Sequence, residues 1–153
     1  ASSKTALIEN GFAGQPLLDL QTAGQLGILS RGAAGRGLAT TPLPSASVID
    51  VAAGDTHFED MIAGIKEGLI VEELLGAGQG NELGGDFRAN VSLGYRIANG
   101  EIVGRVKDTM VSGNVYSVLS QVEYIGDSPE WIFGSLRSPA IQCRGVEVAT
   151  KSE

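Results

Sequence analysis

The sequence has 153 residues, of which 42% are hydrophobic and 19% charged, a composition typical of a folded domain and not of a disordered chain. Its formal net charge is −7, from 18 acidic and 11 basic residues, and no run of Lys or Arg occurs. Because nucleic-acid-binding domains present a basic surface, this charge argues against direct DNA binding, and 22 glycines favour a turn-rich, strand-rich chain over a helical one.

The N-terminal stretch predicts a hairpin and then a short helix. Residues 5–9 and 12–18 have strand character, and Asn10-Gly11 between them suits a tight turn whose central residues need positive φ. Pro16 places the second strand at a sheet edge. A helix is predicted over residues 20–26, with an Asp at its N-cap position and a Gly directly after it.

Residues 30–47 are rich in Gly, Ala, Thr and Pro and predict a long loop. Loops of this length are usually functional or mobile, and Arg31 and Arg36 could contact an anionic group. A solvated crossing without a ligand is the simpler interpretation. A short strand over residues 48–51 is expected to follow.

The clearest predicted helix begins at Thr56, which forms a capping-box pattern with Glu59. Apolar residues then recur at the spacing of one helical face, and Gly68 is the expected end of the helix. The apolar face consists of Phe58, Met61, Ile62 and Ile65.

A strand over residues 68–76 and a glycine-rich segment over 76–85 come next. In the strand, Glu72 and Glu73 are expected to point to opposite faces. The glycine-rich segment lacks the Lys-Ser/Thr pair of a phosphate-binding P-loop and the third glycine of a dinucleotide fingerprint. We therefore interpret it as a structural loop.

Residues 84–114 contain two longer predicted strands, 87–98 and 101–110, on either side of Asn99-Gly100, the second Asn-Gly turn signal of the chain. In the second strand Arg105 and Lys107 alternate with apolar residues. Such alternation is typical of an antiparallel strand with one solvated face.

The C-terminal part predicts one more helix and several strands. Ser112-Gly113-Asn114 is expected to start the helix, and strand material follows at 123–125, 131–133 and 140–148. Together the elements predict a single domain over residues 1–153 of the α+β class. We expect a mostly antiparallel, strongly bent sheet or barrel with a few short helices.

Three motifs, Gly85-Asp86-Phe87, Asn99-Gly100-Glu101-Ile102 and Ser112-Gly113-Asn114, stand in an order and at spacings that resemble the C-terminal half of the TldD/PmbA family. The resemblance extends over nearly the whole chain and includes GLIVEELLG at residues 68–76. Members of this family were first called modulators of DNA gyrase and are now regarded as subunits of a cytosolic metalloprotease. The resemblance implies a cytoplasmic protein and, since the chain has no initiator Met, a C-terminal domain whose N-terminal region is missing here.

In catalytic members of the family, a helical His-Glu-x-x-x-His segment in the N-terminal region and a cysteine from the C-terminal domain bind zinc. The single histidine, His57, lies in no such pattern, and we expect a surface or capping residue. The family's cysteine precedes the last strand, and the corresponding residues 129–137 contain none. We therefore expect Cys143 to be a buried structural thiol, with no metal or cofactor in this chain and zinc in the partner subunit or the missing region.

No set of catalytic side chains is evident. The sequence has no Gly-x-Ser-x-Gly elbow, and one imidazole gives no supported triad. The adjacent acids Glu59 and Asp60 are more simply explained as part of a solvated helix face. We predict no catalytic residue in this chain.

Asp86 and Phe87 are the substrate or interface candidates. Asp86 could orient a peptide or hold a loop near an inter-subunit cleft. However, an Asp at a turn commonly accepts hydrogen bonds from nearby backbone N–H groups, and Phe87 is expected to begin the core. The structural role is the preferred interpretation of both residues.

These observations and the resemblance together predict the C-terminal domain of a subunit similar to PmbA, also called TldE. Such a domain would form the chamber wall and the interface for cleavage of small or unfolded peptides. The implied partner is a TldD-like subunit or a second copy in a homodimer. No nucleic acid is expected to bind. No membrane association is expected either, because no apolar run approaches the roughly 20 residues that span a bilayer. Two alternatives stay open: a stand-alone binding or scaffold domain, and a self-sufficient zinc metalloprotease whose ligands lie in the missing N-terminal region.

Overall fold

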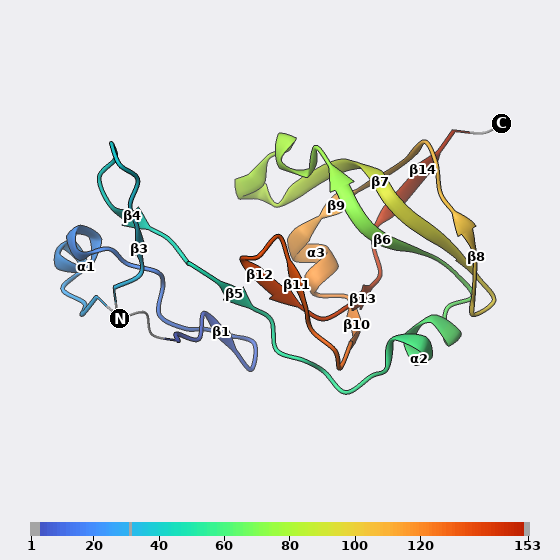
Figure 1. Cartoon of the computed structure of the whole chain (residues 1–153), viewed down its shortest axis with the longest axis horizontal. Helices are drawn as coiled ribbons and strands as arrows, with labels where there is room; N and C mark the ends of the chain where they lie inside the picture. Colours follow the sequence, from blue (N-terminus) through green and yellow to red (C-terminus); the bar gives the residue numbers. More distant parts are fainter. Residues whose placement is uncertain (1–3, 31, 152–153) are drawn as a thin grey trace. The chain divides into compact units, whose positions relative to one another are not determined.

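The computed structural model describes residues 4–30 and 32–151, which divide into two compact units. The first unit consists of the described part of Ala1–Asp50 together with Trp131–Arg137. The second consists of Val51–Glu130 and the described part of Ser138–Glu153. Short helices and mostly antiparallel strands make up both units, which confirms the predicted α+β class (Figure 1).

The first unit begins with the predicted hairpin and helix. Strands β1 (Ile8–Glu9) and β2 (Phe12–Ala13) are shorter than expected and pair across Asn10-Gly11, where both residues have positive φ. Helix α1 (Leu20–Leu26) has the predicted bounds. It begins where the Asp19 carboxylate accepts hydrogen bonds from the backbone N–H and hydroxyl of Thr22, both at 2.6 Å, and it ends at Gly27, whose φ is 66°.

The predicted loop 30–47 contains a small hairpin that the sequence analysis missed. Its strands are β3 (Ala34–Gly35) and β4 (Leu43–Pro44). Arg36 is exposed beside it, and Arg31 lies outside the described residues. Strands this short have no periodicity to detect, and the small residues around them carry no strand signal.

A three-stranded sheet joins distant parts of the chain. Strand β5 (Ile49–Asp50) pairs in parallel with β12 (Leu136–Ser138), which also pairs with β11 (Glu130–Ile132). The Asp50 carboxylate lies 3.3 Å from Arg137 Nη1 and 3.6 Å from Lys4 Nζ. Strands β5 and β11 were predicted, and β12 was not.

The second unit is built on a five-stranded antiparallel sheet (Figure 1). Its order is β14-β9-β7-β6, and β8 adds to it by pairing with β7. The strands are β6 (Glu67–Leu75), β7 (Asp86–Ala98), β8 (Glu101–Arg105), β9 (Thr109–Asn114) and β14 (Glu147–Thr150). In the described residues the sheet is open, so of the two predicted forms, sheet or barrel, the sheet is the one confirmed.

Shorter elements complete the second unit. They are α2 (Phe58–Ala63), α3 (Val115–Leu119), the 3₁₀ helices η1 (Ala77–Gln79) and η2 (Glu82–Gly84), and the paired strands β10 (Val122–Ile125) and β13 (Ile141–Cys143). The predicted strand over 140–148 is thus two strands, which separate at Gly145, where φ is 81°. No helix in the described residues is long and apolar enough to cross a membrane.

The sheet of the second unit encloses the main core. Ala89 and Val91 of β7 and Val111 of β9 are buried together. Half-buried apolar residues pack against them: Leu69, Phe87, Val106 and Val146. Because full burial of one Val side chain stabilises by about 1.5–3 kcal/mol, the buried Val91 and Val111 each contribute on that order to the stability of the sheet.

Helix α2 is shorter than the capping-box prediction. Its N-cap residue is His57 rather than Thr56, and no side-chain hydrogen bond caps it. The helix ends at Gly64, because the backbone carbonyls of Ile65 and Lys66 accept hydrogen bonds from Gly100 and Asn99, both at 2.8 Å. These two hydrogen bonds join residues far apart in the sequence and outweigh the helical spacing of the apolar residues. Strand β6 therefore starts at Glu67.

The predicted hairpin turn at Asn99-Gly100 is confirmed, with φ values of 50° and 81°. The second strand of that hairpin is not continuous, however. It bends after Arg105 and resumes at Thr109, and Asp108 in the corner has φ of 48°. Glu72 and Glu73 of β6 were predicted to point to opposite faces, because side chains alternate along a regular strand. The register between β6 and β7 shifts at this point, so the alternation on which that prediction depended is interrupted.

Candidate functional site

The two motifs at the ends of the 84–114 stretch meet in space. Strand β7 begins at Asp86 and β9 ends at Asn114, and these two residues are partners in the antiparallel register. Phe87 is likewise paired with Gly113. The Gly-Asp-Phe and Ser-Gly-Asn motifs therefore form one junction, which also holds the end of the glycine-rich segment.

The Asn114 side chain makes the central contacts of this junction. Its Nδ2 donates to the Gly84 carbonyl at 2.7 Å and to Asp86 Oδ1 at 2.9 Å. Its Oδ1 accepts from the backbone N–H groups of Tyr116 at 3.1 Å and Ser117 at 3.4 Å, which caps α3. The amide of Asn114 donates two of these hydrogen bonds and accepts the other two; Asp has no donor when ionised and Ser has only one O–H, so neither can reproduce all of these contacts.

Two glycines let the junction close. Gly85 has φ of 80°, and a Cβ there would lie 2.7 Å from ring atoms of Tyr116. A Cβ on Gly113 would lie 3.1 Å from the ring of Phe87. The Val115 backbone N–H donates to the Gly85 carbonyl at 2.8 Å, so both ends of the junction are also joined through the backbone.

Asp86 and Phe87 thus have clear structural contacts. Phe87 is half-buried and packs against the core cluster, and Asp86 is exposed and accepts from Asn114. Asn114 is the residue of this site that sequence reasoning missed. The sequence identifies it as a helix cap, but its contact with Asp86, 28 residues away, has no local signal.

His57 and Asp127 form a second polar cluster in the same unit. His57 Nδ1 contacts Asp127 Oδ2, and the Ser128 hydroxyl donates to Asp127 Oδ1 at 2.7 Å. The Ser128 hydrogen bond, followed by the charge of His57 when protonated, holds the pKa of Asp127 below its usual value. His57 is 73% exposed, so the prediction of a surface residue in a capping region is confirmed.

A shallow hollow lies along the segment before His57. Backbone hydrogen bonds from Gly54 to Gly126 at 2.9 Å and from Asp127 to Thr56 at 3.0 Å hold that segment beside the end of β10. The lining residues are Ala53, Gly54, Asp55, Thr56, Glu123, Tyr124 and Ile125. Its two carboxylates make it unsuitable for an anion.

Cys143 is half-buried in β13, where its register partner is Val122. Burial raises the pKa of the Cys143 thiol, which disfavours the thiolate that zinc requires. Within residues 4–30 and 32–151, no three His, Cys, Asp or Glu side chains lie close enough to hold a metal ion. The described residues therefore form no complete metal site by themselves. The one ligand that the resemblance implies from this domain, a cysteine before the last strand, has no counterpart in residues 129–137.

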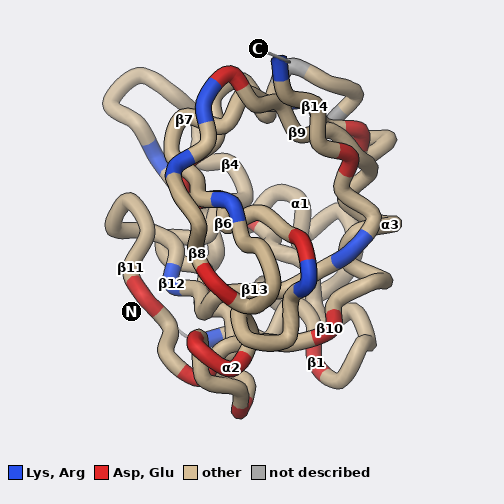
Figure 2. The backbone as a smooth tube through the Cα atoms, turned by 90° about the vertical axis from the view of Figure 1, so that its right-hand side faces the viewer, with Lys and Arg blue, Asp and Glu red and all other residues tan. Residues whose placement is uncertain are grey.

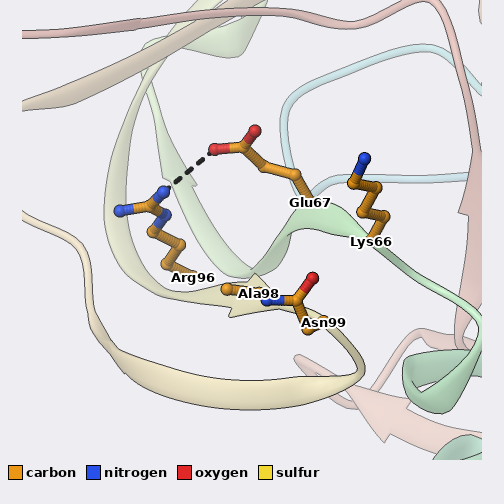
Figure 3. Close-up of a pocket in the computed structure, with 5 residues that line it drawn as sticks. All are labelled: Lys66, Glu67, Arg96, Ala98 and Asn99. Atoms are coloured by element: carbon orange, nitrogen blue, oxygen red, sulfur yellow. Dashed lines mark hydrogen bonds and ion pairs between the residues drawn. The ribbon is translucent and has the colours of Figure 1, made fainter.

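A shallow pocket lies where β6 begins and β7 ends (Figure 3). It is lined by Lys66, Glu67, Arg96, Ala98 and Asn99. Arg96 Nη2 and Glu67 Oε1 are 3.0 Å apart, and because both side chains are mostly exposed, their pairing stabilises by about 1 kcal/mol at most. The pairing also neutralises Arg96. Among the described residues Lys66 then has no ion-pair partner, and one exposed charge gives little basis for selective binding.

Basic and acidic residues are interspersed along the backbone of the second unit (Figure 2). Strands β6 to β8 illustrate this mixture: Glu67, Glu72 and Glu73 stand on β6, and Arg88, Arg96 and Arg105 on β7 and β8. A nucleic-acid interface requires a concentrated basic surface, and this sheet does not have one in the described residues.

A family model and related sequences both connect this chain to the same family of metalloproteases. The model of the PmbA/TldA metallopeptidase C-terminal domain matches residues 1–150. A metalloprotease from Methanothermobacter thermautotrophicus is 33% identical over 125 residues, which cover 82% of this chain and 27% of the relative. A metalloprotease TldD homolog from Haemophilus influenzae is 28% identical over 134 residues, 87% of this chain and 28% of the relative.

Solved structures agree with this result. TldE from Thermococcus kodakarensis superimposes with a TM-score of 0.84 at 26% identity, covering 94% of this chain and 33% of that one. A Thermotoga maritima protein provisionally named as a modulator of a DNA gyrase gives a TM-score of 0.78 at 26% identity, covering 94% of this chain and 32% of that one. The chain therefore spans about a third or less of the length of these proteins. It belongs to the TldD/PmbA metalloprotease family and is the C-terminal domain of that family.

Proposed function

We propose that this domain belongs to a PmbA/TldE-like subunit that does not itself hold the catalytic metal. In this proposal the domain forms part of the chamber wall and subunit interface of a cytoplasmic metalloprotease. A TldD-like partner supplies zinc, and the complex cleaves small or unfolded peptides. The observation that carries the proposal is that residues 129–137, where the resemblance places the family's zinc-binding cysteine, contain no cysteine. The match to TldE along 94% of the chain, with a TM-score of 0.84, agrees with it.

The chemistry of the described residues supports the same assignment. A catalytic domain of this family would contribute a cysteine thiolate to zinc. Cys143 lies in a paired strand with a raised thiol pKa, and residues 129–137 contain no cysteine. His57 contacts Asp127, and in the part of the chain that the structure describes no further His, Cys, Asp or Glu completes a metal-binding group with them.

The names of several relatives favour the other subunit type. The Haemophilus influenzae relative is named a TldD homolog, as is one from Buchnera aphidicola that is 29% identical over 125 residues. The second candidate function is therefore a self-sufficient metalloprotease whose zinc ligands lie outside these 153 residues. Identities below 30% do not separate two subunits that share a fold, so an experiment must.

Zinc analysis of the intact purified protein separates the two candidates. The proposal expects less than stoichiometric zinc and peptidase activity that appears only after a TldD-like subunit is added. Stoichiometric zinc together with activity in the isolated protein would establish the second candidate. Absence of activity with every TldD-like partner tested would instead favour a binding or scaffold domain.

A further inference from the structure

The chain contains two Asn-Gly pairs, and both form hairpin turns of nearly the same geometry. Asn10-Gly11 joins β1 to β2 with φ values of 51° and 78°, and Asn99-Gly100 joins β7 to β8 with φ values of 50° and 81°. The turn conformation accounts for the choice of Asn and Gly at both places. The contacts around the two turns differ, however, and they decide how each Asn side chain reacts.

An Asn is thermolabile when the backbone nitrogen of the next residue can reach its side chain. That nitrogen gives up its proton and attacks the side-chain amide carbon, so that an N–Cγ bond forms while the Cγ–Nδ2 bond breaks and ammonia leaves. Water then hydrolyses either carbonyl bond of the cyclic imide, which yields Asp or isoaspartate. The reaction consumes only water, and a following Gly favours it because no side chain hinders the attack.

The turn at Asn99-Gly100 is held in a conformation that resists this reaction. The attacking nitrogen belongs to Gly100, whose N–H donates to the Ile65 carbonyl at 2.8 Å. The Asn99 N–H donates to the Lys66 carbonyl at 2.8 Å. A Cβ on Gly100 would lie 2.8 Å from the Ala63 carbonyl oxygen, so the backbone at the end of α2 lies directly against the turn. Ring closure therefore requires this edge of the five-stranded sheet to open.

The turn at Asn10-Gly11 lacks these restraints within its own unit. In the described part of the first unit, no backbone carbonyl accepts from the Gly11 N–H, and a Cβ on Gly11 would meet no atom within 4 Å beyond its chain neighbours. Strands β1 and β2 have two residues each and form a sheet of two strands. Since such a hairpin is marginally stable in water, this turn can open without unfolding the rest of the unit.

We propose that Asn10 is a site of spontaneous deamidation and isomerisation and that the fold protects Asn99 from the same reaction. Both products add a negative charge to the turn. Isoaspartate also lengthens the main chain by one atom, because the chain then runs through Cβ and Cγ, and this breaks the register pairing of Glu9 with Phe12. The modification thus opens the β1–β2 hairpin as the protein ages and leaves the sheet of the second unit intact.

Incubation of the full-length parent protein at mildly alkaline pH, followed by peptide mass spectrometry, tests the proposal. The same incubation in guanidinium chloride gives the reactivity of each Asn without a fold, and the ratio of the unfolded to the native rate measures protection. Protection should be a few-fold or less at Asn10 and at least about tenfold at Asn99. Comparable protection at the two sites, or none at Asn99, would overturn the proposal.

Matched variants identify the residue that ages. Asn10→Gly and Asn99→Gly both remove the reactive amide, and Gly accepts the positive φ of either turn. Isoaspartate in the aged protein is counted by enzymatic methylation of its carboxylate. Asn10→Gly should abolish most of this methylation, and Asn99→Gly should leave it unchanged; the reverse result would overturn the proposal. Neither measurement depends on zinc or peptidase activity, so this proposal and the proposed function can fail separately.

Discussion

Asn114 and Asp86 are register partners where β9 ends and β7 begins, and the Asn114 amide joins them with a 2.9 Å hydrogen bond. The same amide binds the Gly84 carbonyl and caps α3. One side chain thus holds together the glycine-rich segment, the end of the β7–β9 pairing and the start of helix α3.

Asn114→Asp should destabilise the intact protein by about 1–2 kcal/mol, since it removes both donated hydrogen bonds and places a second carboxylate beside Asp86. The N-cap acceptor remains, so Asn114→Ala should cost more. Urea unfolding measures both changes. Asn90→Asp, on an exposed position of β7, is the control and should shift stability by about 0.5 kcal/mol or less. Equal effects at positions 90 and 114 would contradict the role of the amide.

Asp86→Asn should leave stability nearly unchanged, because an amide oxygen can still accept from Asn114 Nδ2, whereas Asp86→Ala should lower it by about 1 kcal/mol. If the structural role is complete, peptide cleavage by the intact complex follows stability in both variants. Cleavage that is lost in Asp86→Asn with an unchanged melting temperature would instead assign Asp86 a role toward the substrate. Thermal unfolding and peptidase assays on the same preparations decide between these outcomes.

Gly85→Ala should destabilise through two separable effects: a φ of 80° and a Cβ that would lie 2.7 Å from the Tyr116 ring. A double-mutant cycle with Tyr116→Ala separates them. The cost of Gly85→Ala should fall by about 1 kcal/mol or more when the ring is absent, and the backbone strain should remain. Additive effects would show that the ring moves aside freely.

The pKa of Asp127 should rise when its partners are removed. The Ser128 hydroxyl and His57 keep that pKa low in the folded protein, so Asp127 adds stability above the ordinary carboxyl range. That stability is lost as the pH falls through the lowered pKa. Carbon-13 NMR titration of the carboxyl group should give a higher pKa in Ser128→Ala and in His57→Gln. An unchanged value in Ser128→Ala would contradict the main cause assigned here.

Features that depend on adjacent residues could be predicted from the sequence. Helix α1 has the expected bounds because Asp19 and Gly27 act within its own first and last turns. The Asn-Gly turns follow from the positive φ that those residues accept. Helix α2 was overextended because the hydrogen bonds that end it come from Asn99 and Gly100, far along the chain.

The candidate site likewise combines features that have a local signal in the sequence with a contact that has none. The sequence indicates Asp86 at a turn and Asn114 at a helix start, each from its local pattern. Their contact depends on the register of β7 and β9, which a bend near Asp108 makes possible.

The pairing of β5 with β12 has a consequence for how the chain is made. Asp50 and Arg137 are 87 residues apart, and the larger part of the second unit, Val51–Glu130, lies between them in the sequence. On the ribosome, strands β6 to β9 emerge and can pair before β12, the partner of β5, has been synthesised. The first unit can therefore be completed only late in synthesis, and no single cut of the chain yields either unit whole.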